Sequence, residues 1–261
     1  DYNHPDLKNN IWQNTDEIAG NGIDDDGNGY KDDVRGWDFV WSDNDPMDFY
    51  GHGTHVAGTI AAANNGFGVT GVAPNAKIMP IRILGGFSSI WSNVADGIRY
   101  ATDNGADVIN LSLQDNNLAT EAEKTDVNTA IQYAIDKGVF VAIAAGNFGW
   151  NTPSFPGTYA DRGGIAVGAV NTNNRMFGSI SNSGYLSSNR AGSLKDYVVA
   201  PGFEVNSTTP SNNYQSYSGT SMAAPHVAGV AALVLSANPN LTPSQVEEII
   251  TQTANPAGII A

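Results

Sequence analysis

The sequence contains no cysteine, and this absence removes several kinds of chemistry from consideration. Without thiols the chain has no disulfide framework, no thiolate nucleophile and no cysteine-ligated zinc site. Any covalent nucleophile in this chain must therefore be a hydroxyl group.

Positive charge is also scarce. Lys and Arg together number 12 against 26 Asp and Glu, which gives a net charge of −14. Such a chain repels the phosphates of nucleic acids and of anionic membranes, so we expect neither as a partner and expect bound cations instead. No basic and apolar leader opens the chain, although one could have been removed, and no uninterrupted apolar run approaches the roughly 20 residues of a membrane span.

What is present fits one globular domain. The 261 residues are 41% hydrophobic and 15% charged, a composition that can bury a core and is unlike that of a disordered chain. We expect a single domain over residues 1–261. Residues 9–50 form an acidic insertion, rich in Gly and Asn and with little periodicity, that we expect to be made mainly of loops.

Two kinds of hydrophobic pattern alternate after Gly71. Short β-branched runs at 77–83 and 108–111 alternate with helical patterns at 90–102 and 121–137. This alternation predicts an α/β fold with a mainly parallel central sheet and helices on both faces.

Three further segments refine this fold. The run 139–145 is almost continuously apolar and ends at Gly146 and Asn147, as expected of a central strand buried on both faces. Residues 222–237 are apolar on nearly every side and predict a core helix, which places Ser221 at its N-terminus. Residues 242–253 predict a final helix with Thr242 as its N-cap.

Three side chains in these segments can carry catalytic chemistry. His52 lies between two glycines before an apolar helix, which exposes its ring. Ser221 lies at a helix start, where free N–H groups can stabilise an oxyanion, and Asn147 ends the central strand with a neutral amide donor. Taken singly, each is more often a surface histidine, an N-cap serine or a turn asparagine, so only their combination is specific.

In combination, the segments resemble the subtilase family of serine proteases, and the thermitase-like bacterial branch within it, over almost the whole chain. The matching motifs are His4-Pro5-Asp6-Leu7, Gly51-His52-Gly53-Thr54-His55-Val56-Ala57-Gly58, Ala144-Ala145-Gly146-Asn147 and Gly219-Thr220-Ser221-Met222-Ala223-Ala224-Pro225-His226. The resemblance implies a serine endopeptidase that works through an acyl-enzyme. It implies that Ser221 is the nucleophile, that His52 is the general base, and that Asn147 and the Ser221 N–H form the oxyanion hole.

The resemblance also implies that one triad member lies outside this sequence. In the family the catalytic aspartate ends a strand a few residues before the His-Pro-Asp-Leu motif, so it would precede Asp1. Asp1 and Asp6 are poor substitutes, since the family uses the aspartate of that motif for calcium. The first central strand is then missing from the chain, and we expect the isolated chain to be poorly stable or inactive.

Substrate is expected to lie extended between two backbone edges. By resemblance, Leu113 walls the pocket for the residue before the scissile bond, which favours a large apolar side chain. Gln114 stands where many relatives carry glycine, and its side chain is expected to narrow that pocket. The substrate-binding residues implied are Gly85, Gly86 and Phe87 on one edge, Ser112, Leu113 and Gln114 on the other, and Ala144, Ala145 and Gly146 at the floor.

Structural calcium is expected at up to three places. The best-supported site resembles the strong calcium loop of the family and comprises Asp6, Ala63, Asn65, Phe67 and Val69. A second resembles the calcium loop before the catalytic histidine in thermitase-like subtilases and comprises Asp38, Asp43 and Asp45. A third has oxygen ligands at alternate positions, as in an EF-hand loop, although Arg35 replaces the usual glutamate and an acidic solvated loop is the alternative. Its residues are Asp24, Asp26, Asn28 and Asp32. His55 and His226 are expected to have packing roles.

By resemblance, the protein is extracellular and monomeric, its partners are protein or peptide substrates, and an N-terminal prodomain accompanies it. Two alternatives remain open at this point. The chain could be a non-catalytic subtilase-like module that binds a partner or is stabilised by calcium, because the catalytic aspartate is not in it. It could also be a dedicated processing protease that cleaves one precursor.

Overall fold

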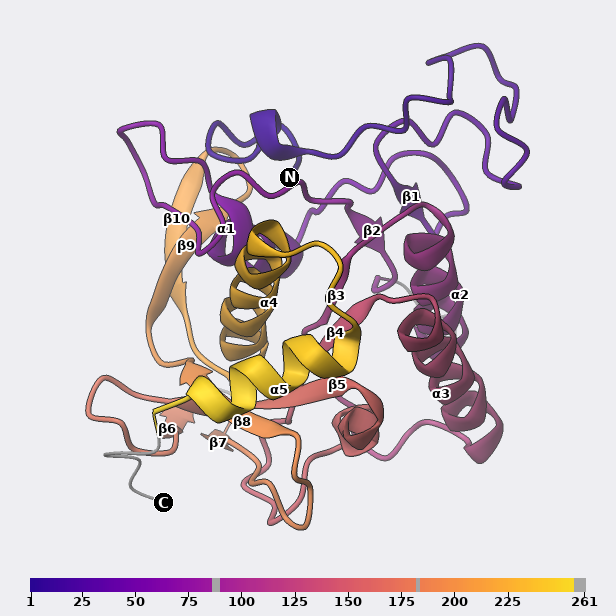
Figure 1. Ribbon diagram of the computed structural model, residues 1–261. Helices are drawn as coiled ribbons and strands as arrows, with labels where there is room; N and C mark the ends of the chain where they lie inside the picture. The colour runs from indigo at the N-terminus through magenta and orange to yellow at the C-terminus, as the bar shows by residue number, and fades with distance from the viewer. Residues whose placement is uncertain (86–89, 182–183, 256–261) are drawn as a thin grey trace.

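The central sheet of the protein has four parallel strands. The computed structural model describes residues 1–85, 90–181 and 184–255. The strands lie in the order β3-β4-β5-β8, and helices cover both faces (Figure 1). Their bounds are β3 (Val108–Leu111), β4 (Phe140–Ala144), β5 (Gly164–Val170) and β8 (Tyr197–Pro201).

Strand β4 separates two hydrophobic cores. Its side chains alternate, so that Val141 and Ile143 pack with helices α2 (Ile90–Asp103) and α3 (Glu121–Asp136). Phe140, Ala142 and Ala144 face the other core, which contains α4 (Thr220–Ala237) and α5 (Pro243–Thr253). Every residue of β4 is buried, as its apolar run predicts. The predicted α/β fold is confirmed.

Helix α4 is long and apolar enough to cross a membrane by length and composition alone. In the fold it packs against the sheet, with Met222, Ala223 and Ala224 buried at its start. It is therefore the core helix that the sequence predicts. Thr242 caps α5 as expected, since its Oγ1 accepts a hydrogen bond from the Gln245 N–H at 3.3 Å.

Smaller elements surround this sheet. Strands β9 and β10 form an antiparallel hairpin that packs on α1, while β6 and β7 form a second hairpin. Strands β1 and β2 form a separate parallel pair. The smaller helices and strands have the following bounds: η1 (Lys8–Asn10), β1 (Trp37–Asp38), α1 (His52–Ala61), β2 (Ile81–Arg82), η2 (Gly157–Arg162), β6 (Gly178–Ser181), β7 (Gly184–Ser187), β9 (Val205–Thr209) and β10 (Asn213–Tyr217).

A large cavity separates strand β2 from strand β3. Among the described strands, β2 pairs with β1 alone and β3 pairs with β4 alone. The cavity has a volume of about 790 Å³ and is lined by residues 76–84, by residues 105–113 and by apolar side chains of α4, including Ala228 and Leu235. Two backbone edges that face one apolar space leave room for one more strand between them.

Candidate active site

His52 is the first residue of helix α1. Gly51, the N-cap, adopts a φ of 95°, and a Cβ atom there would lie 3.1 Å from Pro210 Cδ. Both the left-handed conformation and the close approach of the β9–β10 hairpin require glycine at this position. Burial lowers the pKa of His52, and the nearby Asp48 carboxylate partly offsets this effect. The imidazole is therefore held in the neutral form that a general base needs.

Asp48 caps helix α1 and was not anticipated from the sequence. Its carboxylate accepts hydrogen bonds from the backbone N–H groups of Tyr50, Gly51 and Thr54 and from the Thr54 hydroxyl. Burial raises the pKa of Asp48, but these hydrogen bonds outweigh it and leave the pKa below its usual value. The available signal was an acidic residue just before the helix, where the dipole favours negative charge.

Ser221 lies in the first turn of helix α4, where backbone N–H groups have no acceptor within the helix. Its hydroxyl donates a hydrogen bond to the Ser112 carbonyl oxygen at 3.2 Å, and the Ser112 hydroxyl donates to the Ser221 carbonyl oxygen at 2.8 Å. This reciprocal pair fixes the start of α4 against the residue that follows β3. The Ser221 hydroxyl therefore lies beside the expected substrate edge.

Asn147 follows strand β4 and is oriented by helix α4. Its Oδ1 atom accepts hydrogen bonds from the Thr220 N–H at 2.8 Å and from the Thr220 hydroxyl at 3.1 Å. Because the side-chain oxygen is engaged in this way, the amide nitrogen remains as the group that can donate to a ligand. An oxyanion hole requires such a preorganised, uncharged donor.

These three side chains meet in one cavity. His52, Ser221 and Asn147 line a space of about 330 Å³ together with residues of the expected substrate edge, Ser112, Leu113 and Gln114. Three residues not anticipated from the sequence, Leu84, Trp91 and Val94, add apolar surface. The expected floor residues Ala144, Ala145 and Gly146 are buried and do not line this cavity. Gly85 is described and partly buried, whereas Gly86 and Phe87 lie outside the described residues.

No carboxylate in the described part of the chain is hydrogen-bonded to the His52 ring. The Asp1 carboxylate accepts from the N–H groups of Asn3 and Ser211, and the Asp6 carboxylate accepts from Asn65, Val69 and Tyr214. Neither aspartate therefore takes the third place of a triad here. His52 and residues on both sides of the β2–β3 gap do, however, line the same large cavity, so a strand in the gap would run toward the histidine.

The structure brings the expected strong calcium loop around Asp6. The Asp6 carboxylate is fully buried and receives the Asn65 amide at 2.9 Å and the Val69 N–H at 3.1 Å. A Cβ atom at Gly68 would lie 2.1 Å from Asp6 Oδ2, so the loop can follow this path only with glycine there. The loop thus gathers Asp6, Asn65 and Val69 through N–H donors to the carboxylate, and calcium binding by this set stays a prediction.

The second expected calcium set is not assembled. Asp38 is buried and pairs with the guanidinium of Arg82, which also lies 4.1 Å from the ring centroid of Trp41. Asp45 accepts a hydrogen bond from the Tyr2 hydroxyl. In this structure the charge of Asp38 is balanced by Arg82, and a cation at Asp38, Asp43 and Asp45 stays a prediction. No group of three metal-binding side chains forms there within the described residues.

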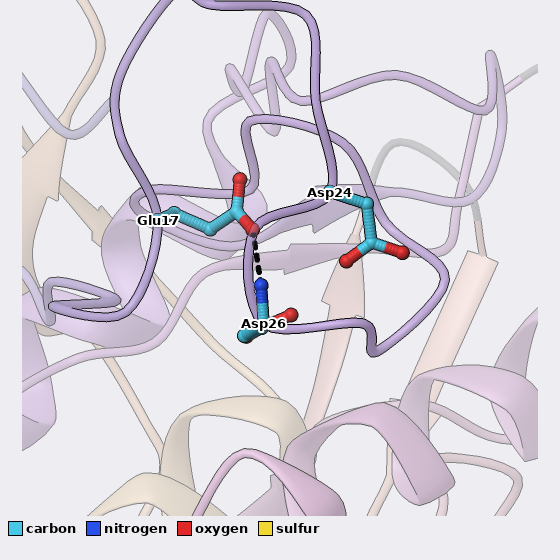
Figure 2. Close-up of side chains that lie close together, drawn as sticks. All are labelled: Glu17, Asp24 and Asp26. Atoms are coloured by element: carbon cyan, nitrogen blue, oxygen red, sulfur yellow. Dashed lines mark hydrogen bonds between the residues drawn. The ribbon is translucent and has the colours of Figure 1, made fainter.

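The third expected set is the one that the fold gathers most closely. Figure 2 shows Glu17, Asp24 and Asp26 together, and one carboxylate oxygen of each lies within 4.8 Å of the others. Asp24 also accepts hydrogen bonds from the N–H groups of Asn28 and Gly29. Asp32 points elsewhere, toward the N–H groups of Asn21 and Gly22. Glu17 was missed because it lies outside the alternating motif and reaches the loop only through the fold.

The histidines provide a test of stability against pH. Burial lowers the pKa values of His4, His52, His55 and His226 below the ordinary 6.5. Below pH 6.5 the unfolded histidines bind protons that the folded ones do not, so these residues make the free energy of unfolding fall as pH decreases. Glu247, whose pKa burial and Asp196 raise to about 7, acts in the opposite direction in the same window.

We therefore expect a His226→Gln variant to lose less stability than the parent between about pH 7.5 and pH 5. His226 suits this test because its Nδ1 is bonded only to the carbonyl oxygen of Met222, one turn earlier in α4. Urea unfolding at a series of pH values measures the difference. Equal losses in parent and variant would contradict the assignment of His226 as a half-buried histidine that stays neutral in the folded protein.

Known proteins match both the sequence and the fold. The model of the subtilase family matches residues 1–260. The chain is 41% identical over 257 residues to a thermophilic serine proteinase of Bacillus sp. (strain AK1), and the match covers 98% of this chain and 54% of that protein. It is 43% identical over 230 residues to subtilisin DY of Bacillus licheniformis, with coverage of 86% and 78%.

A solved structure agrees with these relatives. The crystal structure of a cold-adapted subtilisin-like serine proteinase superposes with a TM-score of 0.75 at 32% identity, and the match covers 99% of this chain and 80% of that one. The chain spans about half the length of most of the curated relatives it matches, and 78% of the length of subtilisin DY. With its motifs, its parallel sheet and its gathered serine, histidine and asparagine, the chain belongs to the subtilase family.

Proposed function

We propose that the chain is the catalytic domain of an extracellular serine endopeptidase that hydrolyses peptide bonds of extended protein substrates. The observation that carries this proposal is the common cavity of His52, Ser221 and Asn147 beside the edge at residues 112–114. The relatives reported above, a serine proteinase and a subtilisin, agree with this activity. A purely binding module would not need a neutral, half-buried imidazole and a free amide donor in one cavity with a half-buried hydroxyl.

The proposed reaction has two halves. Ser221 Oγ attacks the substrate carbonyl carbon while His52 accepts the hydroxyl proton, and the oxyanion receives hydrogen bonds from the Asn147 amide and the Ser221 N–H. As the C–N bond breaks, His52 returns the proton to the leaving amine and an acyl-enzyme remains. Water then attacks the acyl group with His52 again acting as the base, and the acid product leaves. In this scheme Ser221 must first exchange its hydrogen bond to Ser112 for one to His52.

The proposed triad needs a carboxylate that the described chain does not offer to His52. We place it at the carboxyl end of a strand that fills the 790 Å³ cavity between β2 and β3 and pairs with both of them. Such a strand, in a longer form of the chain, would bury its apolar side chains against α4. Its terminal aspartate would orient the imidazole and stabilise its protonated form.

Activity on peptide substrates tests the proposal. A form of the chain that includes the upstream strand should hydrolyse casein and unrelated peptides, and a Ser221→Ala variant of that form should not. A folded, extended form that cleaves nothing would favour the non-catalytic module. Cleavage of one precursor alone would favour a dedicated processing protease.

Calcium is proposed to stabilise this domain at the Asp6 loop and at the Glu17 cluster. Asp6 is buried, and the three carboxylates of the cluster repel one another at close range in a chain of net charge −14. A divalent cation would relieve this repulsion and satisfy hard oxygen ligands. Its role would be structural, because neither set of residues lines the active-site cavity.

Calcium removal should therefore lower the melting temperature. At a calcium concentration 100 times the Kd, one site raises the free energy of unfolding by about 2.7 kcal/mol, which is roughly 5 to 10 °C for a domain of this size. Calorimetry with calcium and with chelator measures the shift. A Glu17→Gln variant should lose part of the shift, whereas Glu121→Gln, on the exposed side of α3, should keep all of it. Equal melting temperatures with calcium and chelator would contradict both sites.

A further inference from the structure

We propose that Gln114 restricts the cleft to small substrate side chains next to the scissile bond, an inference that rests on the proposed function. Strands β3 and β4 pair as far as Leu111 and Ile143. Beyond that point the Gln114 side chain spans the two strand ends, because its Oε1 accepts a hydrogen bond from the Asn147 backbone N–H at 2.7 Å. Gln114 also lines the cavity that holds His52 and Ser221.

The space behind this bridge is filled by the chain itself. Ala145 is fully buried, and a Cβ atom built on Gly146 would lie 2.0 Å from Ser154 Oγ and 2.6 Å from Asn189 Nδ2. Asn189 donates hydrogen bonds to the Ala145 carbonyl oxygen and to the Ser154 hydroxyl. Residues 145–146 are therefore packed against Ser154 and Asn189 on one side, and the Gln114 side chain covers them on the side of the active-site cavity.

A large side chain could enter between the strand ends only by displacing Gln114. That displacement would remove the acceptor of the Asn147 N–H, and a partly buried donor left unpaired is costly. It would also loosen the residue whose side chain is the proposed oxyanion donor. A methyl side chain needs no such displacement. The geometry thus favours alanine over phenylalanine, in contrast to the large apolar residue expected from Leu113 and the Ala-Ala-Gly strand end.

Equilibrium binding of product-like peptides tests this specificity without requiring turnover. Two acetylated tetrapeptide acids, identical except for a C-terminal alanine or phenylalanine, are titrated calorimetrically into the strand-containing form of the chain with calcium. The parent should bind the alanine peptide more tightly. In Gln114→Gly the ratio of the two Kd values should move toward phenylalanine by at least about tenfold, the usual scale for added apolar groups in an open pocket.

Two matched variants separate the effect of the hydrogen bond between Gln114 and the Asn147 N–H from the effect of any substitution near the cavity. Gln114→Glu keeps an oxygen acceptor of the same length and should keep the alanine preference. Asn116→Ala removes an exposed side chain that touches only the far end of Gln114, at 3.4 Å, and should also keep it. In amide hydrogen exchange, the Asn147 N–H should exchange faster in Gln114→Gly than in the parent or in Gln114→Glu.

The outcomes distinguish this inference from the proposed function. An unchanged Kd ratio in Gln114→Gly would overturn the role of Gln114, even if the Asn147 amide exchanged faster. Failure of the parent and of Gln114→Gly to bind either peptide would contradict the substrate cleft itself and therefore both proposals. Tighter binding of the phenylalanine peptide by the parent would overturn the inference and leave the endopeptidase proposal standing.

Discussion

A form of the chain that carries the additional strand and its terminal aspartate should hydrolyse peptides about 10⁴-fold faster than the same form with asparagine at that position. The carboxylate would hold the correct tautomer of His52 and stabilise the imidazolium that forms during proton transfer. In the described structure the charge of the Asp48 carboxylate raises the pKa of His52 at a distance, and no hydrogen bond joins the two side chains. The expected loss is therefore in kcat, with KM little changed.

The same comparison has a spectroscopic readout. A carboxylate beside His52 should raise the imidazole pKa above the burial-lowered value, and an NMR titration of the ring protons would follow this change. The asparagine form provides the matched control, because it fills the β2–β3 cavity equally well. An aspartate form with the same His52 pKa and the same kcat as the asparagine form would contradict the proposed triad.

Replacing Asn147 with alanine should lower kcat by about 100- to 1000-fold, the range known for loss of one oxyanion donor in a subtilisin. The Asn147 amide is oriented by two hydrogen bonds from Thr220 to its side-chain oxygen, so its nitrogen is preorganised for the transition state. Since the donor binds the oxyanion more strongly than the ground-state carbonyl, KM should change little.

The control for this variant is Asn151→Ala, an exposed asparagine in the same loop region. Both proteins are compared by steady-state kinetics on one peptide anilide in the strand-containing form. A small effect of Asn147→Ala, similar to that of Asn151→Ala, would remove Asn147 from the oxyanion hole. A large rise in KM with normal kcat would instead make it a substrate-binding residue.

Local patterns predicted the elements that present the site. The apolar run before Gly146 predicts β4, and the apolar stretch after Ser221 predicts α4, because an element that is buried on all sides consists almost entirely of apolar residues. The cap at Thr242 was predictable because its partner, Gln245, is only three residues away in the sequence. The motifs around His52, Asn147 and Ser221 predicted the residues that meet in the cavity.

Long-range pairings were not predictable in the same way. Asp38 was expected to bind calcium, but Arg82, which is 44 positions away in the sequence, reaches it only after β1 and β2 pair. Glu17 joins Asp24 and Asp26 because an irregular loop folds back on itself. The Gln114 bridge depends on two strand ends that the sequence separates by 33 positions. Each contact is set by tertiary structure, which local patterning does not encode.

A reactive Ser221, in a site that an additional strand between β2 and β3 would complete, is what the protease proposal requires most directly. A fluorophosphonate probe, followed by peptide mapping, measures this in the chain described here and in the strand-containing form, each with calcium and with chelator. We expect rapid labelling of Ser221 in the strand-containing form with calcium, slow labelling in the chain described here, and none in Ser221→Ala. A folded, calcium-loaded strand-containing form that leaves Ser221 unlabelled would contradict the proposed protease and favour the non-catalytic module.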